Sequence, residues 1–186
     1  MTCIAAIIDD DGVGHIASDS LGSNGHSKDV YKDQKVFTNG KFLVEYTSSD
    51  RMGQLLQYRL SLPKQRIGQT IDEFMYIDFV DAVRSLLKEN GYMMINSNRE
   101  EVGSFLVVTE GRIWQMQDDL SLLESSDGFD ACGSGAHHAQ AAMHVLKRHS
   151  QLKLAPKEIP TIAIETASRY VATVGGEVRY ISETIS

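Results

Sequence analysis

The second residue carries two groups that can act together in nucleophilic catalysis. Thr2 follows Met1, and its small side chain favours removal of the initiator methionine. Removal leaves a threonine with a hydroxyl and a free α-amine, whose ordinary pKa of about 7.7–8.0 makes it partly neutral near pH 7. A neutral amine can accept the hydroxyl proton and so activate a weak nucleophile. Thr2 is therefore a candidate nucleophile, although threonine is also a common second residue.

Four histidines near residue 140 suggest a metal cluster at first sight. They are His137, His138, His144 and His149. His137 and His144 are two helical turns apart, whereas two ligands on one helix are typically spaced i, i+4. We therefore expect no metal site.

The remaining reactive side chains are better explained by packing. Cys3 and Cys132 are too few for a disulfide framework, which fits a reducing compartment, and Cys132 is expected in a buried strand. Trp114 lies beside a hairpin turn and is expected to pack in the core. None of these three residues is expected to carry the chemistry.

Composition limits the classes of protein that need to be considered. The chain has 186 residues, of which 42% are hydrophobic and 23% charged, and we expect residues 1–186 to form one domain. A net charge of −7 disfavours nucleic acid as a partner, because binding phosphates requires a basic surface. No apolar run approaches the ~20 residues of a membrane span. Since no signal sequence opens the chain either, we expect a cytoplasmic protein with no membrane partner.

Apolar and alternating segments predict eight strands in three groups. Asn39-Gly40 and Glu110-Gly111 are turns typical of β-hairpins, and a glycine- and serine-rich loop is expected at residues 22–27. The expected strands cover residues 3–8, 13–19, 35–38, 41–44, 104–109, 112–117, 129–132 and 178–181.

Apolar residues at helical spacing predict four helices between these strands. The expected helices cover residues 52–60, 70–87, 136–146 and 156–172. Thr70 and Glu73 form a capping box at the start of the second helix. Pro160 must lie in the first turn of the last helix or shift the start of that helix downstream. The order of strands, two helices, strands, two helices and a strand indicates an α+β protein. Two face-to-face antiparallel sheets, each covered by a helix pair, would form a four-layer αββα sandwich.

Several short segments, in their order along the chain, resemble one family. They are Thr2-Cys3-Ile4, Ile16-Ala17-Ser18-Asp19, Lys35-Val36-Phe37, and Gly133-Ser134-Gly135 before Ala139-Gln140-Ala141-Ala142. The combination resembles the proteasome β subunits and HslV-type peptidases, which are N-terminal-nucleophile (Ntn) hydrolases, and most closely the small bacterial and phage proteasome-like subunits. The resemblance covers nearly the whole chain and implies the αββα fold.

The resemblance implies a role for each of five residues. Thr2 is the nucleophile, and Lys35 lies beside its hydroxyl and amine, where a positive charge lowers their pKa values. Asp19 pairs with Lys35 and orients it. Ser48 offers its backbone N–H to the oxyanion, a contribution of about 3 kcal/mol where such a donor has been removed elsewhere. Ser134 hydrogen-bonds the N-terminal amine.

Two positions depart from the family pattern. The oxyanion position is usually glycine, whereas this chain has Ser48. The family usually places an aspartate late in the last helix, near the threonine amine. The matching residues 168–173 contain no acid.

The resemblance implies hydrolysis of polypeptides by Thr2, without a cofactor, inside a self-compartmentalised homo-oligomeric ring, with an ATP-driven unfoldase as a candidate partner. Three alternatives stay open. The chain could be a weakly active or inactive ring or scaffold subunit, or an amidase acting on small molecules. Gly133-Ser134-Gly135 before a helix could instead bind a nucleotide phosphate, although no downstream lysine or ribose-binding acid completes such a site.

Overall fold

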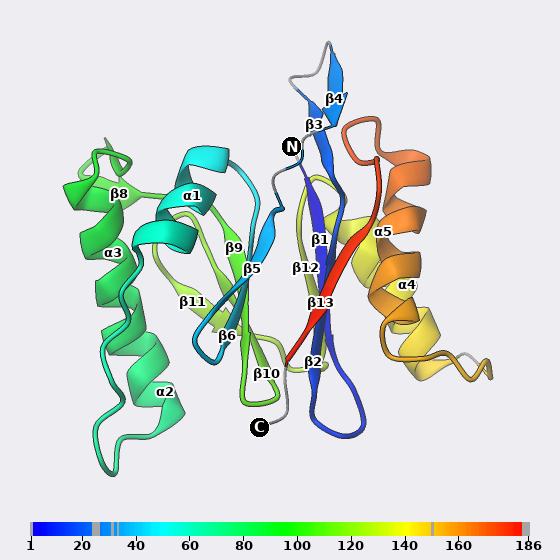
Figure 1. Cartoon of the computed structure of the whole chain (residues 1–186), viewed down its shortest axis with the longest axis horizontal. Coiled ribbons are helices and arrows are strands. Elements are labelled where there is room, and N and C mark those ends of the chain that lie inside the picture. The colour runs from blue at the N-terminus through cyan, green and yellow to red at the C-terminus, as the bar shows by residue number, and fades with distance from the viewer. Residues whose placement is uncertain (1, 24–26, 31, 33, 150, 184–186) are drawn as a thin grey trace.

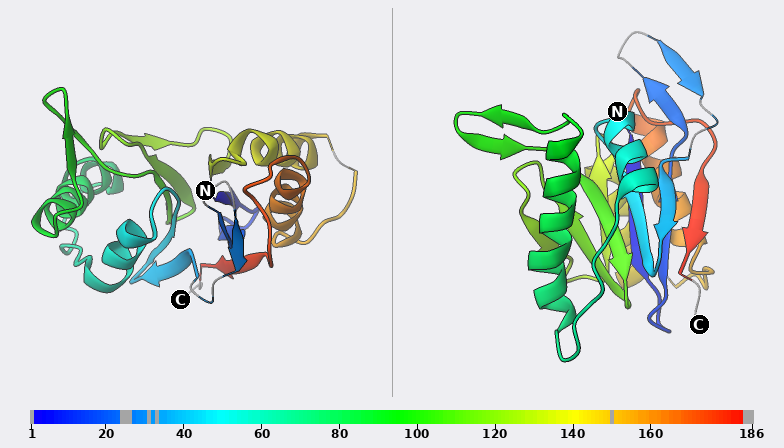
Figure 2. Two further views of the ribbon diagram at one scale, coloured as in Figure 1. Left: turned by 90° about the horizontal axis from the view of Figure 1, so that it is seen from above. Right: turned by 60° about the vertical axis from the view of Figure 1, so that its left-hand side comes forward.

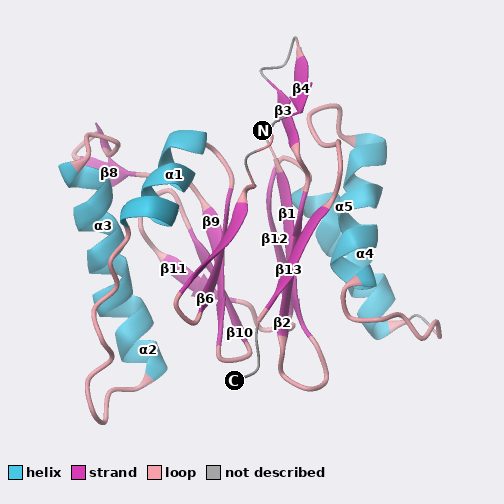
Figure 3. Ribbon diagram, in the orientation of Figure 1, coloured by secondary structure: helices cyan, strands magenta, loops and turns pink. Residues whose placement is uncertain are grey.

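Two sheets lie face to face between two outer layers of helices (Figures 1 and 3). The computed structural model describes residues 2–23, 27–30, 32, 34–149 and 151–183. The predicted α+β class and the αββα order of layers are confirmed. In Figure 1, β1 and β5 begin at the same end of the sandwich.

The first sheet has the strand order β12-β1-β2-β13, and each neighbouring pair is antiparallel. Its strands are β1 (Cys3–Ile8), β2 (Gly14–Ser18), β12 (Phe129–Gly133) and β13 (Arg179–Ser182). Cys3 is paired with Gly133 across the β1–β12 ladder. Thr2 precedes Cys3 and Ser134 follows Gly133, so Thr2 and Ser134 lie beside each other at the same end of the sheet.

The second sheet has the order β11-β10-β9-β6-β5 and is also antiparallel. Its strands are β5 (Val36–Asn39), β6 (Phe42–Tyr46), β9 (Phe105–Thr109), β10 (Arg112–Met116) and β11 (Leu122–Glu124). Both predicted hairpin turns are present. Gly40 and Gly111 adopt φ values of 60° and 68°, in the left-handed region that glycine enters without a Cβ clash.

The helices form one pair on each side. The helical segments are α1 (Asp50–Arg59), α2 (Ile71–Glu73), η1 (Phe74–Phe79), α3 (Val80–Glu89), α4 (Ala136–Arg148) and α5 (Glu158–Tyr170). The Thr70–Glu73 capping box is present, and the stretch expected as one helix contains a π-helical segment, η1. Pro160 lies in the first turn of α5, where its missing N–H costs no helical hydrogen bond. Within the described residues, no helix is long and apolar enough to cross a membrane.

Strand alternation divides the apolar side chains into three layers, because successive residues point to opposite faces of a sheet. On β1, Cys3, Ala5 and Ile7 pack against α4 and α5, whereas Ile4 and Ala6 face the second sheet. The layer between the sheets, called here the inter-sheet layer, consists of Ile4, Ala6, Ile16, Val36, Leu43, Leu106, Val108, Ile113 and Cys132. A third cluster joins the second sheet to α1 and the η1–α3 helix.

Two short hairpins were absent from the sequence-based prediction. The predicted loop at 22–27 overlaps β3 (Leu21–Ser23), which pairs with β4 (Lys28–Val30), while residues 24–26 lie outside the described part. β7 (Met94–Asn96) and β8 (Arg99–Glu101) form a second hairpin that projects beyond the end of α3 (Figure 2). Both are short and largely polar, so they lack the apolar alternation by which strands are recognised in a sequence.

Candidate active site

Asp19 organises the end of the sandwich at which the chain begins. It follows β2 directly, and only 1% of its surface is exposed. Its Oδ1 accepts hydrogen bonds from Lys35 Nζ at 3.0 Å and from the Cys3 N–H at 3.2 Å. Its Oδ2 accepts the Gly175 N–H at 3.1 Å. A buried carboxylate with one cation and two backbone donors is well satisfied, because the new hydrogen bonds replace those lost to water.

Lys35 reaches Asp19 from the other sheet. It immediately precedes β5, and 8% of its surface is exposed. Its Nζ also donates to the Leu21 carbonyl at 2.8 Å, which fixes the ammonium between two acceptors. The structure therefore brings Asp19 and Lys35 together, as the resemblance implies.

Thr2 lies next to this pair, at the start of β1, and is 5% exposed. Its carbonyl accepts hydrogen bonds from the Ser134 N–H at 2.8 Å and from Ser134 Oγ at 3.2 Å. The structure thus brings Ser134 to Thr2. The Ser134 hydroxyl contacts the carbonyl, whereas the resemblance directs it to the amine. Met1 precedes Thr2 in this chain, so the Thr2 nitrogen is an amide and offers no amine lone pair.

Gly133 allows this close approach. Its φ is 93°, and a Cβ added there would lie 2.2 Å from the Thr2 carbonyl oxygen. The same Cβ would lie 3.5 Å from the Cβ of Thr47. Only glycine fits at this position. Thr47, which directly follows β6, and Thr2 therefore both lie next to Gly133.

Ser48 lies just beyond β6 and adopts φ 69°, an unusual conformation for a residue with a side chain. Its Oγ accepts the Ser104 N–H at 3.3 Å, so the hydroxyl is turned toward the second sheet. In the described part of the chain, no hydrogen bond occupies the Ser48 N–H. The Ser48 N–H, the predicted oxyanion donor, is therefore free to bind a substrate oxygen. Ser48 directly follows Thr47, which lies beside Thr2 at Gly133.

The stretch that lacks an acid contributes a hydroxyl instead. Thr173, which follows α5, places its Oγ1 3.1 Å from Ser134 Oγ. This contact was not predicted, because a threonine among surface residues carries no distinctive signal. It connects the last helix to the residue that holds the Thr2 carbonyl.

Glu45 is the second residue that the sequence reasoning missed. It is a β6 residue with no exposed surface, and neither carboxyl oxygen has a hydrogen-bond partner among the described residues. Burial raises the pKa of Glu45 well above its usual range, and the nearby Asp19 charge adds to that shift. The Ser18 hydroxyl and the Lys35 ammonium oppose it. An acid within the apolar run Phe42-Leu43-Val44-Glu45-Tyr46 was the available signal.

The other candidate groups do not join this site. Burial raises the pKa of the Cys3 thiol to about 12 and that of Cys132 to about 11, so both remain protonated and unreactive. Trp114 is buried, with the Arg112 guanidinium 4.7 Å from its ring centroid, as a packing residue. No three His, Cys, Asp or Glu side chains are grouped to hold a metal ion in the described residues.

The turn at residues 133–135 is already occupied by the chain itself. The Ser134 N–H, which a phosphate would need, donates to the Thr2 carbonyl, and a Cβ at Gly135 would lie 2.6 Å from Cys3 Sγ. The turn thus packs against the start of β1. This packing argues against the nucleotide-binding alternative.

A cavity of about 550 Å³ opens beside the segment that carries Lys35. Gln34, the residue before Lys35, borders it, as does Tyr46, whose N–H donates to the Lys35 carbonyl at 3.1 Å. The remaining lining residues are Lys32, Arg51, Gln54, Leu55, Gln57, Tyr58 and Arg59. Among the described residues, the lining contains three cationic side chains and no acid.

No protein-family model matches the sequence. The ATP-dependent protease subunit HslV of Bacillus cytotoxicus is 35% identical over 69 residues, which are 37% of this chain and 38% of that protein. The matched stretch therefore spans little more than a third of that relative's length.

Solved structures match over almost the entire chain. BPH of Thiobacillus denitrificans, in complex with epoxomicin, has a TM-score of 0.78 at 22% identity and covers 100% of both chains. HslV from Trypanosoma brucei has a TM-score of 0.74 at 16% identity, covering 98% of this chain and 100% of that one. Anbu (ancestral beta-subunit) from Yersinia bercovieri has a TM-score of 0.65 at 14% identity, covering 98% and 81%.

The layers and these matches define the class of fold: this chain has the αββα fold of the Ntn hydrolases. Within that class, it is similar to the HslV-type and proteasome-like subunits, as the sequence resemblance indicated.

Proposed function

We propose that this chain is a threonine-type peptidase in which Thr2, once Met1 is removed, attacks an amide carbonyl. The main support is the single Asp19 oxygen that accepts both the Lys35 ammonium and the Cys3 N–H. This oxygen holds the Lys35 ammonium close to Cys3, the residue that follows Thr2. A fixed cation favours the neutral form of a nearby amine, and so lowers its pKa toward the working range of a general base.

The proposed reaction passes through an ester of Thr2. The α-amine takes the hydroxyl proton as Oγ bonds to the carbonyl carbon, and the Ser48 N–H donates to the resulting oxyanion. The C–N bond then breaks, and the ammonium returns its proton to the leaving amine. Water, deprotonated by the same amine, attacks the ester, and release of the carboxylic acid regenerates Thr2.

The proposal extends to the assembly. We expect a homo-oligomeric ring of this chain that acts on polypeptides in the cytoplasm, with an ATP-driven unfoldase as partner. The fold match to HslV supports the ring, and the name of the Bacillus cytotoxicus relative, an ATP-dependent protease subunit, supports the partner. Light scattering coupled to size exclusion tests the ring directly, because a monomer would contradict it.

A ring or scaffold subunit without efficient chemistry is the second candidate. Its support is the Thr173 hydroxyl beside Ser134, in the stretch where the family pattern has an acid. In that case Thr2 would not react, whether Met1 is retained or removed, while the ring would still form.

Intact-mass measurement separates the two candidates. The peptidase should have lost Met1 and should gain the mass of a peptide epoxyketone on incubation, with the modified peptide mapping to Thr2. Thr2→Ser keeps a hydroxyl and an amine and should still react, whereas Thr2→Ala should not. Retention of Met1, or no addition to the trimmed chain, would exclude the proposed peptidase.

A further inference from the structure

Glu45 places a carboxyl group in the apolar space between the two sheets. Val36 lies opposite it on β5 and Leu106 opposite it on β9. Both belong to the inter-sheet layer, and paired residues point to the same face of a sheet, so Glu45 also points into that layer. An ionised carboxylate is costly there, because it gives up its hydration without gaining a partner.

The Lys35–Asp19 pair borders this carboxyl. Lys35 precedes Val36, the cross-strand partner of Glu45, and Asp19 follows Ser18, whose buried hydroxyl lies close enough to Glu45 to favour its ionised form. The fields of Lys35 and Asp19 both reach Glu45. Two buried carboxyl groups therefore lie within the field of one ammonium, which contacts only Asp19 of the two.

We propose that Glu45 is a protonated positioning residue, whose neutral carboxyl leaves Asp19 as the sole counter-ion of Lys35 and the Lys35 charge free to act on the Thr2 amine. This inference rests on the proposed peptidase function. Glu45 touches no substrate in this scheme and acts only through Lys35. The site thus requires Glu45 to stay neutral while Asp19 is ionised. When two carboxyl groups lie close together in a buried site, the repulsion between their charges keeps one of them protonated.

Ionisation of Glu45 should switch the site off at alkaline pH. A second carboxylate would cancel the field of Lys35 at Thr2, so the Thr2 hydroxyl would lose the nearby positive charge that helps it give up its proton to the amine. The other titratable groups near Glu45 from the neighbouring strands are Cys3 of β1 and Cys132 of β12, whose pKa values of about 12 and about 11 keep them neutral until higher pH. The facing positions on β5 and β9 are apolar.

The rate of epoxyketone addition at Thr2, measured against pH, tests this role. Glutamine matches glutamic acid in shape but cannot ionise, so Glu45→Gln should move the alkaline limb upward by about one pH unit while the acid limb stays in place. A purely structural role would lower the rate evenly at every pH. Coincident alkaline limbs, or an even loss, would overturn the proposal.

Infrared spectroscopy tests the protonation state without any activity. The spectrum of the wild-type chain at pH 7, minus that of Glu45→Gln, should contain the carbonyl stretch of a protonated carboxyl. Glu89→Gln, which changes an exposed acid at the end of α3, should remove only a carboxylate band. If Glu45→Gln does not fold, ¹³C-glutamate labelling of the wild-type chain should shift the same protonated-carboxyl band.

These readouts distinguish the two proposals. A reactive Thr2 without a protonated-carboxyl band overturns the role of Glu45 and leaves the peptidase intact. An unreactive Thr2 with the band present overturns the peptidase, and with it any effect of Glu45 on catalysis.

Discussion

Lys35 Nζ and Asp19 Oδ1 form a buried ion pair, 3.0 Å apart, that joins the two sheets at the end where the chain begins. Asp19 directly follows β2 of one sheet, and Lys35 directly precedes β5 of the other. The pair is therefore structural as well as chemical. Asp19 is 1% exposed and Lys35 is 8% exposed, so the pair is shielded from water.

Lys35→Ala is expected to destabilise the chain in addition to abolishing reaction at Thr2. Asp19 would keep two backbone donors but lose its cation, and removing one partner of a buried pair typically costs about 3–5 kcal/mol. Urea denaturation measures the loss, and epoxyketone addition measures the reactivity. A variant as stable as the wild type would show that the pair contributes little.

The double variant Lys35→Met with Asp19→Asn is the matched control for this loss. It removes both charges while keeping similar side-chain shapes, so it should recover most of the stability. It should not recover reaction at Thr2, because the fixed cation is gone. Recovery of reactivity together with stability would mean that Lys35 acts only by holding the fold.

Gly133→Ala should displace the Thr2 carbonyl and strongly reduce reaction at Thr2. The added Cβ would lie 2.2 Å from that oxygen, and backbone atoms cannot yield as a flexible side chain does. Gly128→Ala is the control, because Gly128 has a similar left-handed φ of 68° but only the Lys147 ammonium lies near its added Cβ, at 3.6 Å. If both variants lost reactivity equally, the loss would come from backbone strain and not from displacement of the Thr2 carbonyl.

The fold was predictable because its signals are local. The Thr70–Glu73 capping box, the Asn39-Gly40 turn and the apolar helix stripes each depend on neighbouring residues, and all three are present. The pairing of β1 with β12 joins residues more than a hundred positions apart, so the sequence pattern alone could not give its register. That the chain forms a single domain stays a prediction.

The site was predictable only through the family resemblance. Asp19 and Lys35 are ordinary in sequence, and their contact exists because the end of β2 lies beside the start of β5. Thr173 and Glu45 belong to no pattern that the resemblance supplied. Their importance follows from contacts and burial that arise only once the sheets are packed.

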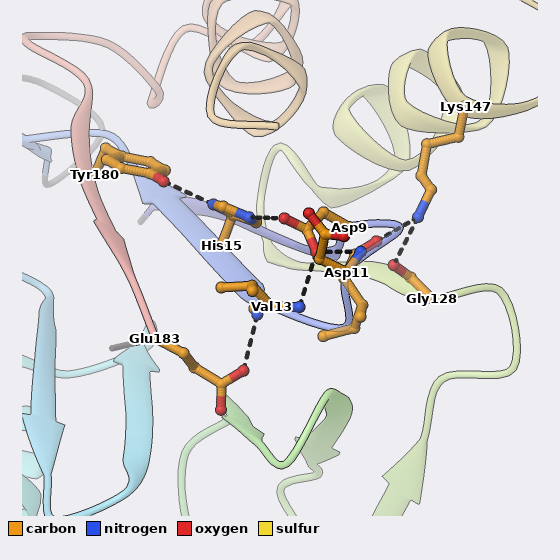
Figure 4. A network of polar contacts seen from close by, with 10 residues as sticks. Asp9, Asp11, Val13, His15, Gly128, Lys147, Tyr180 and Glu183 are labelled. Carbon is orange, nitrogen blue, oxygen red and sulfur yellow. Dashed lines mark hydrogen bonds and ion pairs between the residues drawn. The ribbon is translucent and has the colours of Figure 1, made fainter. Parts of the chain in front are cut away.

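Asp9 should contribute stability that is lost in acid. It follows β1 and contacts the His15 ring at 2.9 Å, which in turn contacts the Tyr180 hydroxyl at 2.6 Å (Figure 4). Burial tends to raise the pKa of Asp9, but the His15 contact and the Val13 and Asp11 N–H groups outweigh it, so the pKa is lowered. A lowered folded-state pKa gives stability that is complete above the unfolded value of about 3.9 and disappears below the folded value.

Asp9→Asn should therefore be less stable than the wild type at pH 7, and the difference should shrink as the pH falls below about 4. Urea denaturation across pH 3–7 measures both free energies of unfolding. Asp11→Asn, which removes an exposed carboxyl from the same turn, is the control and should show a smaller difference at pH 7. A constant difference between wild type and Asp9→Asn throughout this range would contradict the linkage.

The cavity beside Lys35 should favour substrates with an acidic side chain next to the cleaved bond. Lys32, Arg51 and Arg59 line it, and no acid does so in the part of the chain that the structure describes. An opposite charge gains about 0.2–1 kcal/mol per exposed pair. Arg51→Glu should lower the kcat/KM ratio of a glutamate-containing over a lysine-containing fluorogenic peptide by about threefold to tenfold. Lys64→Glu changes the net charge equally but lies outside the lining, so its ratio should match that of the wild type. Equal ratios in all three chains would show that substrate side chains do not enter this cavity.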